Sequence, residues 1–161
     1  MSMVPSLRNM TSVYLIRNEN MLLLYRQGSR VANDVYIGAA GGHFEPHELN
    51  DPKACALREM KEEIDITADM VEDLSLRYIA LRNVNGEVRQ NYYFFANLKE
   101  ERMLSSNEGI LKWVPLEEVM LLPMPFTSKF VLAHYLESGR FNDTLYGGVA
   151  TVEEIVFFPM G

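Results

Sequence analysis

Two neighbouring segments dominate this sequence, GGHFEPHE at residues 41–48 and REMKEEIDI at residues 58–66. The first opens with two glycines, which allow the backbone to turn sharply or to approach a ligand closely. The second places Glu59, Glu62 and Glu63 within five positions. Glycines, an acidic loop and an acidic helix in this order predict a functional site at the centre of the fold.

The residues around the second segment predict a helix over Pro52–Ile64. Asp51 is a favourable N-cap, and a proline suits the first helical position because its missing N–H would find no partner there. At about 100° per residue, apolar side chains fall on one side of this helix and the three glutamates on another. The apolar side chains are Leu57, Met60 and Ile64.

The crowded glutamates require an explanation, because like charges three or four positions apart each destabilise a helix by about 0.2–0.5 kcal/mol. One explanation is a solvated face in which Arg58 and Lys61 interleave with the acids. The other is a hard divalent cation, since carboxylate oxygens are the ligands that Mg²⁺ takes. The glycine-rich and acidic segments that precede the helix favour the cation.

The combined pattern resembles the signature of the Nudix hydrolases, which runs Gly, five residues, Glu, seven residues, then Arg-Glu-apolar-x-Glu-Glu-x-Gly-apolar. Gly42, Glu48 and Arg58 match its fixed points. Two features differ, because nine residues separate Glu48 from Arg58 and Asp65 stands where the signature has a glycine. A loop tolerates the longer spacing, and aspartate accepts left-handed backbone better than most residues.

The resemblance implies the Nudix fold, an α/β (α+β) architecture with a mixed β-sheet sandwiched between α-helices. We expect one domain over residues 1–161, with the signature at residues 41–66. The resemblance also implies hydrolysis of a nucleoside diphosphate linked to another group, with Mg²⁺ or Mn²⁺ as cofactor. Carried over onto this chain, it makes Glu59, Glu62 and Glu63 metal ligands, with the backbone carbonyl of Gly41 as an additional one.

The same resemblance assigns roles to three further residues. Arg58 would orient the carboxylates, and Glu48 would be structural or support the ligands from behind. A Glu-Gly pair at Glu108, ahead of a strand that carries Trp113, is similar to the segment that holds the general base in MutT-like members. Glu108 is therefore the candidate base or an extra metal ligand, and a solvated loop acid is the alternative. We expect Trp113 to be buried, because a lone tryptophan on a strand usually buries its ring.

The rest of the chain predicts strands, turns and two more helical stretches. Asn85-Gly86 is a strong signal for a hairpin turn. The tail, Phe141–Met160, predicts a last hairpin that turns at Gly147-Gly148. A polar loop is expected over Gly28–Asp34. The expected strands are Ser12–Arg17, Met21–Gln27, Val35–Ile37, Leu74–Val84, Val88–Leu98 and Ile110–Val114, and the expected helical stretches are Leu116–Met120 and Thr127–Glu137.

Composition limits the partners. Fifteen basic against 22 acidic residues give a net charge of −7, which disfavours a nucleic-acid polymer or an anionic membrane. No apolar run approaches the roughly 20 residues that cross a bilayer. Cys55 is the single cysteine, so no disulfide can form within the chain and we expect a cytoplasmic protein. A homodimer through the apolar tail Val156–Met160 is one expectation, and an edge strand within one chain explains that tail equally well.

Three functional hypotheses remain open. The leading one is a MutT-like pyrophosphohydrolase that acts on an oxidised purine nucleoside triphosphate of the 8-oxo-dGTP type. In that family an asparagine near the start of the final helix reads the purine, and Thr127 and Ser128 stand in that place here. The second is a pyrophosphatase for ADP-ribose or a nucleotide sugar. The third is a sensor that binds a nucleotide without cleaving it.

Overall fold

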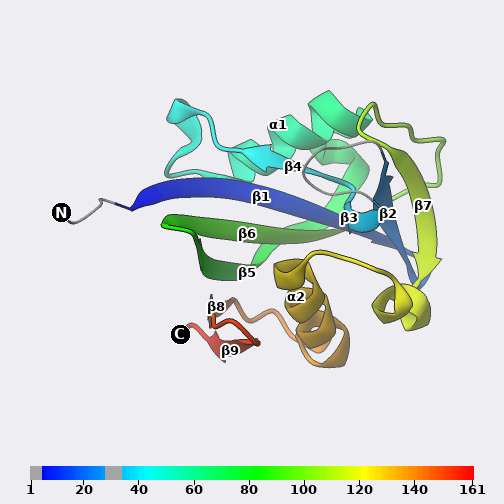
Figure 1. The fold of residues 1–161 in the computed structure, drawn as a ribbon. Coiled ribbons are helices and arrows are strands. Elements are labelled where there is room, and N and C mark those ends of the chain that lie inside the picture. Colours follow the sequence, from blue (N-terminus) through cyan, green and yellow to red (C-terminus); the bar gives the residue numbers. More distant parts are fainter. Residues whose placement is uncertain (1–4, 28–33) are drawn as a thin grey trace.

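The structure is a computed structural model that describes residues 5–27 and 34–161. Most of the polar loop expected over Gly28–Asp34 therefore lies outside the described residues. Within those two ranges, nine strands form one mixed sheet whose main path runs β3-β2-β1-β6-β5-β8-β9 (Figure 1). The strands are β1 (Ser6–Arg17), β2 (Asn20–Arg26), β3 (Val35–Gly38), β4 (Ala40–His43), β5 (Val71–Val84), β6 (Glu87–Leu98), β7 (Ile110–Pro115), β8 (Tyr146–Ala150) and β9 (Ile155–Pro159).

Two α-helices and four short 3-10 helices complete the described chain. The α-helices are α1 (Pro52–Ile64) and α2 (Phe126–Glu137), and the 3-10 helices are η1 (Pro46–Glu48), η2 (Ala68–Met70), η3 (Leu116–Leu121) and η4 (Gly139–Phe141). Both predicted helices and the short helical stretch after β7 are confirmed, as are the expected strands, to within a few residues at their ends. None of these helices is both long and apolar enough to cross a membrane.

The sheet separates two apolar cores, each covered by one helix. Along β1 successive side chains point to opposite faces, so Val13 and Leu15 pack with Met60 of α1. Tyr14, between them, packs on the other face with Leu132 of α2. Figure 1 shows α1 and α2 on opposite sides of the long central strands. The predicted sheet between helices is therefore confirmed.

The strands β5 and β6 meet at the predicted hairpin. Asn85 and Gly86 have positive φ values of 51° and 84°, as the favoured two-residue turn requires. On its other edge β6 runs parallel to β1, beginning with Ser6 beside Glu87. This pairing makes β1 longer than the predicted Ser12–Arg17, because backbone hydrogen bonds extend the strand through a polar segment that the apolar pattern does not mark.

The tail is a hairpin, but the predicted position of its turn is wrong. Gly147 and Gly148 lie within β8, which pairs with both β5 and β9. The chain turns instead at residues 151–154, where the Thr151 hydroxyl accepts hydrogen bonds from the N–H groups of Glu153 and Glu154. A Cβ on Gly148 would lie 2.8 Å from Cδ1 of Phe157, so this glycine provides room for a ring rather than for a turn.

Gly148→Ala should lower the free energy of unfolding by about 1–3 kcal/mol, because the new methyl group overpacks against Ile155 and Phe157. Gly147→Ala is the matched control, since its Cβ would meet only the flexible end of Met160, at 3.3 Å. Urea unfolding of both variants measures the difference. Equal stability of the two variants would contradict this packing.

Candidate active site

Local signals at its ends hold α1 in place. Asp51 caps the first turn by accepting a hydrogen bond from the Ala54 N–H at 3.1 Å, and Pro52 occupies the first helical position. At the other end Asp65 adopts left-handed backbone, with φ 55° and ψ 40°. Both expectations are confirmed. The longer spacing before Arg58 is accommodated by η1 and the short turn that follows it, which leave the acidic helix in register.

The two glycines of the first segment lie in β4, alongside β1, rather than in a loop. Gly41 and Gly42 pair with Ser12 and Thr11 in the antiparallel register. A side chain on Gly41 would overlap the carbonyl oxygen of Thr11, and a Cβ on Gly42 would lie 2.5 Å from Oε1 of Glu59. The glycines therefore allow close approach, as expected, and bring bare backbone against an acidic side chain of α1.

The three glutamates of α1 differ in their surroundings. Glu59 is 8% exposed and lies inward, under β4. Glu63 is half-buried, and its Oε2 accepts a hydrogen bond from the Gly41 N–H at 3.1 Å. The side chain of Glu62 is 58% exposed. The predicted separation of acidic and apolar sides is therefore wrong for Glu59, because β4 covers α1 in addition to the central sheet.

The apolar side of α1 is close to the prediction. Met60 is fully buried and Ile64 is 3% exposed, whereas Leu57 is only half-buried and Ala56 takes a core position in its place. Cys55, one turn before Glu59, is fully buried and packs as a small side chain.

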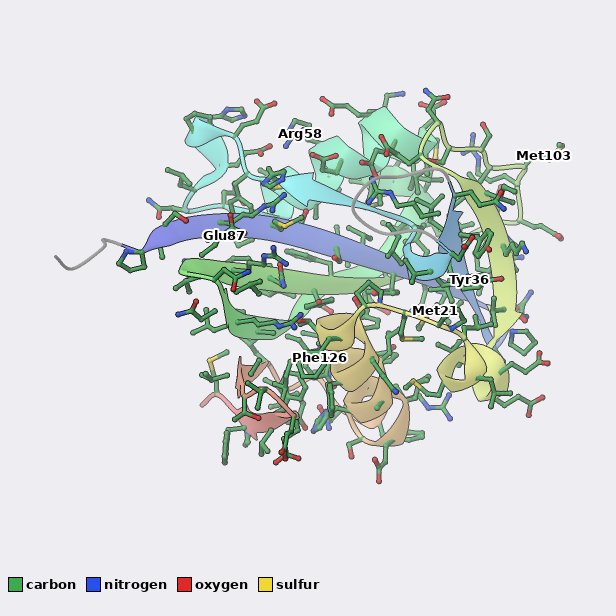
Figure 2. The ribbon with its side chains drawn as sticks, in the orientation of Figure 1. Met21, Tyr36, Arg58, Glu87, Met103 and Phe126 are labelled. Carbon is green, nitrogen blue, oxygen red and sulfur yellow. The ribbon has the colours of Figure 1, made fainter. Side chains whose placement is uncertain are left out.

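Arg58 connects the acidic residues of both segments. Its Nε and Nη2 donate to the two carboxylate oxygens of Glu48 at 2.8 and 2.9 Å, a bidentate arrangement. Nη1 lies 3.0 Å from Glu59 Oε1 and donates to Glu62 Oε2 at 3.0 Å. Nη2 also donates to the carbonyl oxygen of His43 at 3.0 Å. Figure 2 shows Arg58 on the α1 side of the sheet, away from Phe126 on α2.

Glu48 is an ionised anchor for this arginine. It is 1% exposed, and burial alone would favour its neutral form. The hydrogen bonds from Arg58, with a further one from the Glu45 N–H at 2.9 Å, outweigh burial and lower the pKa of Glu48 to about 2. The carboxylate therefore keeps its charge across the physiological pH range.

The surroundings of Glu63 shift its pKa in the opposite direction from that of Glu48. Burial, reinforced by the nearby carboxylates of Glu59 and Glu108, raises the pKa of Glu63 to about 7, although the Gly41 N–H opposes the shift. Close carboxylates resist being charged together unless a cation lies between them. The oxygen-only donor set of Glu59, Glu62, Glu63 and the β4 backbone fits a hard divalent cation such as Mg²⁺.

The carboxylates are not gathered into a preformed metal cluster. Across residues 5–27 and 34–161, no three acidic, histidine or cysteine side chains converge as a metal site. The contacts of Arg58 explain why the carboxylates do not converge, because this arginine holds one oxygen of Glu59 and one of Glu62. Those two side chains are therefore oriented by a cation of the protein itself.

Glu108 lies near this cluster, in the loop that precedes β7. Its N–H donates to the Ser106 hydroxyl at 3.1 Å, and its carboxylate, 47% exposed, accepts a hydrogen bond from Arg26 Nη2 at 3.2 Å. It is close enough to contribute to the raised pKa of Glu63. The sequence does not predict the contact between Arg26 and Glu108, because the two residues are 82 positions apart and no local pattern links them.

The expectation for Trp113 is wrong. Trp113 is 36% exposed. Its strand, β7, pairs with β2 and lies off the main path of the sheet. The ring stays partly in solvent, although Leu111 on the same face of β7 packs against the core beneath α1. The three histidines do not gather in one place: His43 and His47 are exposed, and His134 packs among Tyr78 and other aromatic rings.

The structure therefore has a mixed sheet between two helices, with an Arg-Glu-x-x-Glu-Glu helix packed under a glycine-containing strand. The sequence model of the NUDIX domain family matches residues 7–135, and the chain belongs to this family. It is accordingly a Nudix hydrolase, of the kind that acts on nucleoside diphosphates linked to another group.

Solved structures of related proteins share the fold. The mutator MutT protein from Bacillus halodurans superposes with a TM-score of 0.68 at 24% identity, covering 94% of this chain and 97% of its own. The E. coli dihydroneopterin triphosphate pyrophosphohydrolase has a TM-score of 0.62 at 19% identity, with 81% and 94% covered. A C. elegans Ap4A hydrolase has a TM-score of 0.65 at 18% identity, with 85% and 99% covered.

Glu48→Gln should lower the free energy of unfolding at pH 7 by about 2 kcal/mol, because it replaces a charge-assisted bidentate pair with Arg58. The folded-state pKa of about 2 lies below the ordinary value of 4.5. The stabilisation is therefore complete above pH 4.5 and is lost as the pH falls toward 2. Urea unfolding of wild type and variant at pH 7, 4 and 3 should show the gap closing.

The matched control for this measurement is Glu45→Gln. Glu45 lies 3.7 Å from Arg58 with a side chain that is 50% exposed, so its charge should contribute little. A Glu48→Gln variant as stable as Glu45→Gln at pH 7 would contradict the role of Glu48 as an anchor.

Proposed function

We propose that this Nudix hydrolase is a nucleoside triphosphate pyrophosphohydrolase of the MutT type, dependent on Mg²⁺ or Mn²⁺. The observation that carries the proposal is the packing of Glu59 and Glu63 together against the backbone of Gly41 and Gly42. Two carboxylates in this position destabilise the protein unless they serve a ligand of opposite charge.

The proposed metal ligands are Glu59, Glu62, Glu63 and the backbone carbonyl of Gly41. A divalent cation there would neutralise phosphate oxygens and lower the pKa of a bound water, so that the water can attack phosphorus. Arg58 orients two of these carboxylates, and the buried Glu48 fixes Arg58 in turn.

Glu108 is the proposed general base. Its carboxylate is close enough to Glu63 to affect the pKa of that residue, and it accepts a hydrogen bond from Arg26. From that place it would accept the proton of the attacking water, a role that requires hydrogen-bond reach in the complex with substrate. If Glu108 is instead a loop acid that only faces solvent, its removal should leave the rate of hydrolysis unchanged.

The leading substrate is an oxidised purine nucleoside triphosphate of the 8-oxo-dGTP type. Its support is the resemblance of the signature and of the fold to MutT proteins. Thr127 and Ser128, both less than a tenth exposed, stand at the start of α2, so no amide side chain reads the purine from there. We place the enzyme in the cytoplasm, with small nucleotides rather than nucleic-acid polymers as its partners.

Product analysis tests the reaction. The chain with Mg²⁺ should convert 8-oxo-dGTP to its monophosphate and pyrophosphate faster than it converts dGTP or ADP-ribose. Faster release of AMP from ADP-ribose would instead identify a pyrophosphatase for ADP-ribose or a nucleotide sugar. Tight nucleotide binding without turnover of any of the three would identify a sensor and overturn the proposal.

Glu62→Gln and Glu63→Gln should each lower kcat/KM by more than about 100-fold, because each removes a proposed metal ligand. Circular dichroism should show an intact fold, since neither side chain lies in the core. Glu118→Gln, an exposed acid on η3, is the matched control and should keep the wild-type rate. Wild-type rates in both site variants would contradict the proposed ligands.

A further inference from the structure

A cavity lies at the C-terminal end of α2, where the helix meets β5 and β6. Its volume is about 620 Å³, within the range of about 300–1,000 Å³ typical of small-molecule sites. Its lining includes Arg77 of β5, Asn97 of β6, Tyr135 of α2, Arg140 of η4 and Asn142. No lining residue comes from α1 or β4, so this cavity is separate from the acidic cluster.

Arg77 is a buried cation with only neutral partners. It is 6% exposed, yet its hydrogen bonds all go to uncharged oxygens. Nε donates to the carbonyl oxygen of Thr144 at 3.0 Å, and Nη2 donates to the carbonyl oxygen of Gly139 at 2.7 Å and to Asn142 Oδ1 at 3.1 Å. Nη1 has no acceptor in the described part of the chain. Arg58, by contrast, is balanced by Glu48.

An irregularity in the pairing of β5 places Arg77 in the lining of the cavity. Leu76 pairs with Phe94 and Tyr78 pairs with Tyr93, so Arg77 is an extra residue in the ladder, a β-bulge. Bulges re-aim side chains and are common next to functional sites. A guanidinium stays charged in proteins, and a buried charge without a counter-charge is destabilising. The carbonyl oxygens of Gly139 and Thr144, which accept hydrogen bonds from Arg77, offset part of that cost.

A second cation lines the same cavity. The side chain of Arg140 is 31% exposed and pairs with Glu19 at 3.5 Å, at the edge of the molecule. Two acids, Asp73 and Asp143, also line the cavity, and both are exposed, so solvent screens them more than it screens Arg77. The buried part of the cavity is therefore the most favourable place for an anion.

We propose that this cavity binds a small phosphate-bearing molecule, with its phosphate group on Nη1 of Arg77 and on Arg140. Arginine is the side chain best matched to phosphate oxygens, and the cavity is larger than a bare phosphate ion requires. Arg140 and Asn142 lie beyond the family match at residues 7–135, whereas Arg77 and Tyr135 lie within it. The site is independent of the proposed reaction.

Isothermal titration calorimetry of the full chain in EDTA tests the site, because EDTA removes metal-dependent nucleotide binding at α1. The probes are AMP, inorganic phosphate and adenosine. AMP or phosphate should bind saturably and adenosine should not. Tighter binding of AMP identifies an organic phosphate as the ligand, and equal binding identifies the free ion. Failure of all three probes, or adenosine binding as tightly as AMP, overturns the proposal.

Variants locate the binding. Arg140→Gln should weaken it about tenfold, the effect of one charge-assisted hydrogen bond, and Asp143→Asn should tighten it. Ser75→Phe places a ring in the cavity without removing any bond of Arg77, and should weaken binding by obstructing the ligand. Arg82→Gln, on the same strand but over Phe126, is the matched control and should bind as wild type. Unchanged affinity in both Arg140→Gln and Ser75→Phe overturns the site.

Discussion

The bidentate pair between Arg58 and Glu48 joins the two conspicuous segments of the sequence into one unit. Glu48 belongs to η1, before the helix, and Arg58 to the second turn of α1, so the pair fixes how the helix lies against the strand that precedes it. The same guanidinium holds Glu59 and Glu62. A buried pair of this kind is costly to break, because either partner alone would be an uncompensated charge.

The acids that this arginine orients make the site locally unfavourable. Glu59 is nearly buried under Gly42, and Glu63 has a pKa of about 7 because of burial and neighbouring carboxylates. Sequences violate such rules mainly at functional sites, where a ligand restores the balance. The cavity lined by Arg77 is a similar case with the opposite charge, because a buried cation there lacks an acidic partner among the described residues.

What the sequence predicted correctly depends on local signals. The capping aspartate Asp51 and the left-handed Asp65 bound α1 at the expected residues, because both act within one turn of the helix. The errors arise from long-range pairing. Gly148 makes room for the ring of Phe157 on a neighbouring strand rather than forming a turn, and Trp113 stays partly exposed on a strand off the main path of the sheet. The inward position of Glu59 likewise depends on β4, which periodicity along the helix does not register.

The central claim is that a divalent cation binds among the carboxylates of α1. Titration of the metal-free protein with Mn²⁺, with free Mn²⁺ followed by electron paramagnetic resonance, tests it without any substrate. The account predicts saturable uptake by the wild type that is lost in the double variant Glu59→Gln, Glu63→Gln and kept in Glu118→Gln. Uptake that is absent in the wild type, or equal in the double variant, would contradict it.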